Sequence, residues 1–99
     1  MNQRIVDHFN HSAQTALASG ESLADDILRA SEAMLDTLDN GGKLLLCGNG
    51  GSATDAMHFS AELLVRFQKE RKALPAVALV SDTATLTATG NDYAFDQIF

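Results

Sequence analysis

The segment CGNGGS at residues 47–52 is followed at helical spacing by Asp55, His58 and Glu62. The backbone N–H groups of a glycine-rich turn that opens a helix bind anions, and the helix dipole favours negative charge there. His58 and Glu62 are four residues apart and share one face of a helix. Because imidazole and carboxylate groups bind zinc and other divalent ions, we expect half of a metal site beside the anion-binding loop, with Asp55 orienting the imidazole.

Other interpretations of these residues stay open at this point. Residues 48–53 also fit the loose dinucleotide-binding pattern, but that pattern needs an acidic residue about twenty positions further on, and Asp82 lies later than that. A nicotinamide or flavin site is therefore disfavoured. The glycines can also serve only the conformation of a tight turn, and His58 with Glu62 can form only an exposed hydrogen-bonded pair.

Two further features have weaker chemical signals. The pair Asn91-Asp92 is expected to lie near the carboxyl ends of the strands, where parallel sheets bind ligands, although it also suits a simple helix exit. Cys47 is interpreted as a small buried strand residue rather than a nucleophile, since no cation lies beside it in the sequence to activate a thiolate. The run Lys69–Lys72 includes an acid and is interpreted as the solvated end of a helix.

The elements that position these residues follow from the apolar pattern. Apolar residues that recur every three or four positions predict two successive amphipathic helices. The helices would be separated at Ser19-Gly20, and the second would end at residues 40–42. Short apolar runs at 43–47 and 76–80 predict parallel strands. Between them the pattern predicts a helix over about 53–70, which gives a βαβ unit.

The ends of the predicted helices carry particular capping residues. Ser52 is expected to cap the helix over about 53–70, whose buried stripe would include Ala56 and Phe59. Ser81 or Asp82 is expected to cap a short helix over 83–89, and Gly90 to end it. The apolar residues after position 94 indicate the opening of another element.

We accordingly expect an α/β fold with a parallel sheet and flanking helices. Residues 1–40 are predicted to form a helical hairpin for oligomerisation, and residues 41–99 the first part of an incomplete α/β domain. A sheet of two strands would have open edges, so we expect a fragment or a chain completed by partners.

Composition limits the classes of function. The net charge of −6 disfavours nucleic-acid binding, which needs clustered cations, and no apolar run is long enough to span a bilayer. The 45% hydrophobic and 20% charged residues suit a soluble globular protein. A single cysteine and no signal-like segment at the start predict the cytoplasm.

Across all 99 residues the sequence resembles the amino-terminal half of the phosphoheptose isomerases of the sugar isomerase (SIS) family, which have a flavodoxin-like parallel sheet. Four ordered motifs carry the resemblance: CGNGGS at 47–52, DAMHFSAEL at 55–63, LPAVAL at 74–79 and GND at 90–92.

The resemblance implies an enzyme that converts sedoheptulose 7-phosphate to D-glycero-D-manno-heptose 7-phosphate, for lipopolysaccharide core heptose. It implies one zinc ion per site with His58 and Glu62 as ligands, Glu62 as catalytic acid/base, and a homotetramer. In the family, the remaining metal ligands come from the second half of the protein chain. This chain alone is therefore expected to be inactive. Substrate contacts are implied for the following residues: Asn49, Gly50, Gly51, Ser52, Glu62, Asn91 and Asp92.

Two other functions are compatible with a SIS-type sequence. One is a non-catalytic relative that binds the replication initiator DnaA, in which the glutamate position is lost. The other is a phosphosugar-sensing domain, which needs the loop but no metal pair. The presence of both His58 and Glu62 favours the isomerase.

Overall fold

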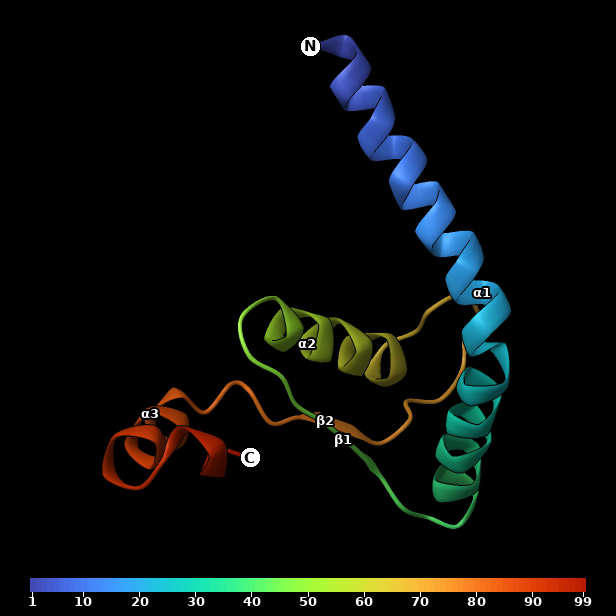
Figure 1. The fold of residues 1–99 in the computed structure, drawn as a ribbon. Coiled ribbons are helices and arrows are strands. Elements are labelled where there is room, and N and C mark those ends of the chain that lie inside the picture. Colours follow the sequence, from blue (N-terminus) through green and yellow to red (C-terminus); the bar gives the residue numbers. More distant parts are fainter. The chain divides into compact units, whose positions relative to one another are not determined.

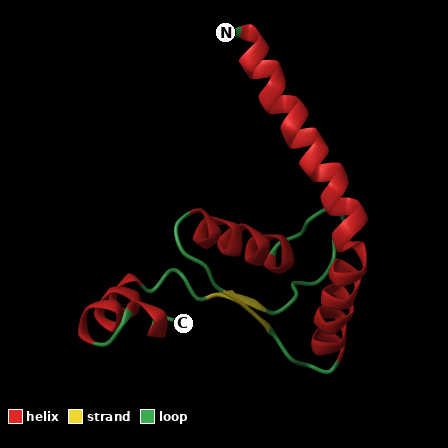
Figure 2. Ribbon diagram, viewed as in Figure 1, coloured by secondary structure: helices red, strands yellow, loops and turns green.

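The computed structural model describes residues 1–99 and contains two strands and four helical elements (Figures 1 and 2). In chain order these are α1 (Asn2–Asp39), β1 (Leu44–Leu46), α2 (Gly51–Leu64), β2 (Ala76–Ala78), α3 (Thr83–Asp92) and the 3₁₀-helix η1 (Phe95–Gln97). The chain divides into two compact units, residues 1–36 and 37–99, and every candidate site residue lies in the second.

β1 and β2 form a parallel two-stranded sheet, as the apolar runs predict. Leu44 pairs with Ala76 and Leu46 with Ala78, and helix α2 makes the connection between the strands. The same register continues beyond the strands, because Leu44 N–H donates to Pro75 O and Leu79 N–H to Leu46 O. Parallel pairing places both strand ends, and hence the glycine loop and the start of α3, on one side of the sheet (Figure 1).

The small core of this unit lies between α2 and the sheet. Ala56 and Ser60 of α2 and Ala76 of β2 are its buried residues. The hydroxyl of Ser60 lies 3.5 Å from Ala76 O, across the contact. The predicted stripe of large apolar residues on α2 is only partly buried, since Phe59 is 44% exposed. The helix therefore contacts the sheet through its small residues.

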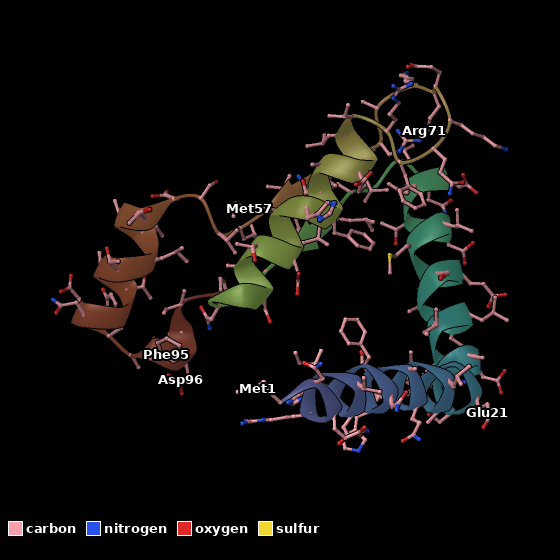
Figure 3. The ribbon with its side chains drawn as sticks, turned by 90° about the horizontal axis from the view of Figure 1, so that it is seen from above. Met1, Glu21, Met57, Arg71, Phe95 and Asp96 are labelled. Atoms are coloured by element: carbon pink, nitrogen blue, oxygen red, sulfur yellow. The ribbon has the colours of Figure 1, made fainter.

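The predicted break at Ser19-Gly20 is wrong, because α1 is one continuous helix and no helical hairpin forms. Gly20 does not adopt positive φ, which a left-handed helix cap requires. Glycine inside a helix costs only about 1 kcal/mol relative to alanine, which the helix formers around it offset. The ribbon bends near Glu21, where a serine–glycine pair weakens the helix (Figure 3).

Most large apolar side chains of α1 are exposed in the single chain. The helix has no buried residue. Gly41, at φ +77°, ends it as predicted, and the N–H groups of Gly41 and Gly42 donate to Leu38 O and Thr37 O, as in a Schellman motif. The exposed large apolar residues of the helix are Ile5, Val6, Phe9, Leu17, Leu23, Ile27, Leu28 and Leu35.

Other predicted helix ends need correction. Helix α2 ends at Leu64 rather than near residue 70, and its N-cap is Gly50, so Ser52 does not cap it. Helix α3 continues through Gly90 to Asp92, because Gly90 keeps negative φ and packs near Ile98. The predicted cap by Asp82 is confirmed. Of the final apolar residues, Phe95 begins η1, which packs on α3, and Ile98 and Phe99 follow it.

None of the helices combines the length and the hydropathy that a membrane span requires.

Candidate functional site

A tight turn links β1 to α2 and exposes backbone N–H groups. Ser52 N–H donates to Asn49 O at 3.0 Å, which closes a four-residue turn. Gly50 lies at its second position with φ 57° and ψ −122°, the conformation that type II′ turns reserve for glycine. The N–H groups of Gly50 and Gly51 make no backbone hydrogen bond, and no side chain caps the helix. Together with the helix dipole, these donors suit a phosphate group.

Gly48 is required for a different reason, which is steric. A Cβ atom at this position would lie 2.6 Å from the backbone carbon and oxygen of Ser52. The first turn of α2 therefore folds back against Gly48. The side chain of Ser52 is exposed and makes no hydrogen bond within the chain, so its hydroxyl is available to a ligand of the loop.

His58 and Glu62 lie one turn apart on α2, as their spacing predicts. His58 Nε2 and Glu62 Oε1 are 2.9 Å apart, with 76% and 36% of the respective side chains exposed. A divalent ion with bonds of about 2.0–2.1 Å to nitrogen and oxygen needs two such atoms about 3 Å apart. The pair therefore fits two positions of a metal site, and the structure contains no cluster of three or more ligand residues.

Two open hollows connect the glycine loop with this pair. One, of about 480 Å³, is lined by Cys47 and Ser52 together with Asp55 and Phe59. The other, of about 250 Å³, is lined by His58 and Glu62 and again by Asp55 and Phe59. Because the hollows share two lining residues, they are adjacent, with Ser52 on one and Glu62 on the other.

Asp55 faces the same surface but makes no hydrogen bond with His58. Its predicted role in orienting the imidazole therefore stays a prediction. Cys47 is an exposed free thiol rather than the buried strand residue that we expected, because β1 ends one residue before it.

Asn91 and Asp92 lie in the last turn of α3 and bond each other, with Asn91 Nδ2 donating to Asp92 Oδ1 at 2.9 Å. Both are exposed, and α3 packs on η1 rather than on α2 or the strands. The structure does not bring this pair into contact with His58 or Glu62. Its substrate-binding role stays a prediction.

The start of α3 differs from the start of α2, because the Asp82 side chain accepts hydrogen bonds from the first turn of α3. Asp82 accepts hydrogen bonds from the backbone N–H of Thr85 at 3.1 Å and from the Thr85 hydroxyl at 2.7 Å. The hydroxyl bond is the main cause, followed by the backbone bonds, of a lowered pKa of the Asp82 carboxyl. This helix start is therefore not open to an anion.

The sequence interpretation missed Arg71. It was expected in a solvated helix end, but its guanidinium group is partly buried and donates to Glu62 O at 2.7 Å and to Leu63 O at 2.9 Å. The sequence alone does not indicate this contact, because it does not show that α2 ends at Leu64. The loop after Leu64 folds back and brings Arg71 to the end of the helix.

Comparisons with known proteins agree with this arrangement. The SIS domain profile matches residues 8–99. The phosphoheptose isomerases of Shewanella loihica and Shewanella sediminis are both 56% identical over all 99 residues, which correspond to 50% of each relative. The chain thus spans about half the length of the curated relatives that it matches.

Solved structures show the same fold. Phosphoheptose isomerase GmhA from Neisseria gonorrhoeae superposes with a TM-score of 0.87 at 45% identity, covering 99% of this chain and 50% of that one. A phosphoheptose isomerase from Francisella tularensis gives a TM-score of 0.86 at 42% identity, with 100% and 50% coverage. These likenesses confirm the predicted α/β class.

Proposed function

The chain belongs to the SIS domain family, and on this premise we propose that the full-length protein is a phosphoheptose isomerase. The reaction is the aldose–ketose conversion of sedoheptulose 7-phosphate to D-glycero-D-manno-heptose 7-phosphate, which supplies heptose for the lipopolysaccharide core. The observation that carries the proposal is the 2.9 Å pair of His58 and Glu62, one to three turns beyond an anion-binding glycine loop. The relatives described above carry the same name.

The glycine turn would bind the phosphate end of the sugar. Gly50 and Gly51 offer backbone N–H groups and Ser52 a hydroxyl, all at the positive end of the α2 dipole. The hollow beyond Ser52 leaves room for the carbon chain to extend towards Glu62. Asn49, Asn91 and Asp92 are proposed to hold sugar hydroxyls once substrate is bound.

Glu62 would move the proton between the two adjacent carbons through an enediol. One of its oxygens, Oε1, faces His58 Nε2, while Oε2 is free to accept a proton from the substrate. The partial burial of this side chain strengthens its electrostatic interactions relative to bulk water.

His58 and Glu62 would also hold a divalent ion, which we propose to be zinc. A bound ion polarises the substrate carbonyl and stabilises negative charge on its oxygen. The imidazole and carboxylate suit this ion chemically, and the remaining ligands come from outside this chain. Metal binding would need His58 as the neutral imidazole and Glu62 as the carboxylate. Glu62 has two carboxylate oxygens, so one could serve as a ligand while the other accepts the proton.

The proposal is tested by Glu62→Gln in the full-length protein. Glutamine keeps the size of the side chain but cannot accept the proton, so kcat should fall by about 10²–10⁴-fold. The readout is turnover of sedoheptulose 7-phosphate, with zinc content measured in parallel. Glu70→Gln is the matched control, since Glu70 is exposed and pairs only with Arg66. Full turnover by Glu62→Gln would refute the proposal.

The proposed assembly is a homotetramer in the cytoplasm. The support is the row of exposed apolar residues along α1, which needs a partner surface, and the unpaired Cys47, which suits a reducing compartment. Light scattering on the full-length protein measures the assembly, and a monomer would contradict it. The DnaA-binding and phosphosugar-sensing alternatives are not favoured, because neither needs the His58–Glu62 pair.

A further inference from the structure

Helix α2 ends directly after the residue that the proposed reaction depends on most. Its last residue is Leu64, so Glu62 lies in the final turn. The last four carbonyl groups of a helix have no N–H partner within the helix, and such turns fray unless another group satisfies them. A frayed final turn would move the backbone that carries the Glu62 side chain.

The Arg71 guanidinium group donates to the Glu62 carbonyl and also to the Leu63 carbonyl, which accepts a further hydrogen bond from Leu74 N–H at 3.0 Å. Its Nη2 donates to Glu62 O at 2.7 Å, and its Nη1 donates to Leu63 O at 2.9 Å. Nη1 also lies 3.2 Å from Lys72 O, which ties the group to its own loop. The side chain thus bridges the helix end and the loop that follows it, and Figure 3 shows Arg71 in this loop beyond α2.

The charge and the surroundings of Arg71 suit this role. A cation at a helix C-terminus interacts favourably with the negative end of the dipole. Arg71 also lines an apolar hollow of about 300 Å³ together with Phe59, Glu62, Leu63 and Phe67. Both ends of the Glu62 residue are therefore fixed: its carboxylate by His58 and its carbonyl by Arg71.

We infer that Arg71 is a positioning residue, which holds the last turn of α2 so that the Glu62 carboxylate stays opposite His58. This inference rests on the proposed isomerase function. Arg71 does not touch the reacting atoms, and it acts through the backbone of Glu62. A planar guanidinium group with two parallel donors is required, because a lysine ammonium cannot bond both carbonyls in the same geometry.

The test uses Arg71→Ala, Arg71→Lys and Lys72→Ala in the full-length protein. Arg71→Ala should lower kcat by about 10–100-fold with KM within about twofold, because a misplaced carboxylate affects the chemical step more than phosphate binding. Arg71→Lys should recover only part of kcat. Lys72→Ala removes the same charge from an exposed neighbour and should stay within about twofold of wild type.

A second readout does not depend on turnover. Titration with Co²⁺, followed by its visible absorption, reports the ligand geometry at His58 and Glu62, and its affinity should fall by about 10-fold in Arg71→Ala. Circular dichroism checks folding. If Arg71→Ala does not fold, Arg71→Lys decides, and wild-type kcat and Co²⁺ affinity in that variant overturn the inference.

The outcomes separate this inference from the proposed function. Wild-type kcat and Co²⁺ affinity in Arg71→Ala overturn the role of Arg71 and leave the isomerase intact. A wild-type protein that binds Co²⁺ but does not turn over sedoheptulose 7-phosphate refutes the isomerase, while the titration still measures the effect of Arg71 on the pair. A wild-type protein that does neither refutes both.

Discussion

The starts of α2 and α3 occupy equivalent places, each just beyond a strand of the same parallel sheet, but they are built in opposite ways. At α2 the cap is Gly50, no side chain accepts a hydrogen bond from the first N–H groups, and these backbone donors stay open. At α3 the Asp82 carboxylate occupies the donor of Thr85. A helix start becomes an anion site only where the chain leaves its own donors unsatisfied. The difference supports the proposal that the phosphate binds at the start of α2.

Gly48→Ala should have the largest effect on the start of α2. The new Cβ would lie 2.6 Å from the Ser52 backbone, so the first turn of α2 has to shift. We expect a loss of about 3 kcal/mol in the free energy of unfolding and about a 100-fold fall in kcat/KM. Chemical denaturation and turnover of the full-length protein measure the two effects. Wild-type kinetics would show that the anion loop does not depend on this close approach.

Gly50→Ala tests the backbone conformation of the turn, because the added methyl group would contact no other atom. No atom lies within 4 Å of the added Cβ, but φ 57° with ψ −122° is strained for any L-residue. The expected cost is about 1–3 kcal/mol, with weaker binding of inorganic phosphate because the turn opens. Isothermal titration with phosphate measures the binding. A variant with unchanged stability and phosphate affinity would contradict the assignment of the anion site to this turn.

Asp82→Ala should have a smaller effect, limited to stability. Removing the cap of α3 is expected to lower the Tm of the full-length protein by about 2–4 °C without changing KM. A raised KM would show that the start of α3 also binds substrate, which would remove the contrast with α2.

The pH dependence of the same cap has a definite sign. The pKa of Asp82 is lowered in the folded state, mainly by the Thr85 hydroxyl. Its stabilising contribution is therefore fully present above the ordinary aspartate pKa and is lost as pH falls through the lowered value. Asp82→Asn should keep part of the cap but lose this pH dependence, as thermal unfolding between pH 5 and about pH 3 would measure.

The smallest expected effect has the opposite sign. Gly20 lies inside α1 with ordinary φ and nothing within 4 Å of an added Cβ. Gly20→Ala should therefore stabilise the protein by about 0.5–1 kcal/mol, as measured by chemical denaturation. A destabilised variant would mean that the bend near Glu21 is needed for packing against a partner.

The sequence predicts the parts of this unit that local patterns determine. Apolar runs locate both strands, and the aspartate at position 82 identifies a cap. The spacing of His58 and Glu62 places both side chains on one face, because helical geometry alone decides that. Glycine is harder to interpret, because Gly41 ends a helix whereas Gly20 and Gly90 lie inside helices, and packing rather than residue type separates these cases.

The features that could not be predicted depend on contacts between distant residues. The end of α2 is set by a loop that returns to Leu63 through Arg71 and Leu74 N–H, so periodicity alone extends the helix too far. The cap at Gly50 depends on the turn closed by Asn49 O, and it takes the place of the more usual serine cap.

The buried contact between α2 and the sheet has a consequence for how the sequence can vary. Ala56, Ser60 and Ala76 are its three buried residues, and all have small side chains. They set the height of α2 above the strands, and through it the height of His58 and Glu62 above the sheet. A larger side chain at any of the three positions would push α2 away from the sheet. The size of three buried side chains between α2 and the sheet thus sets the position of the His58–Glu62 pair.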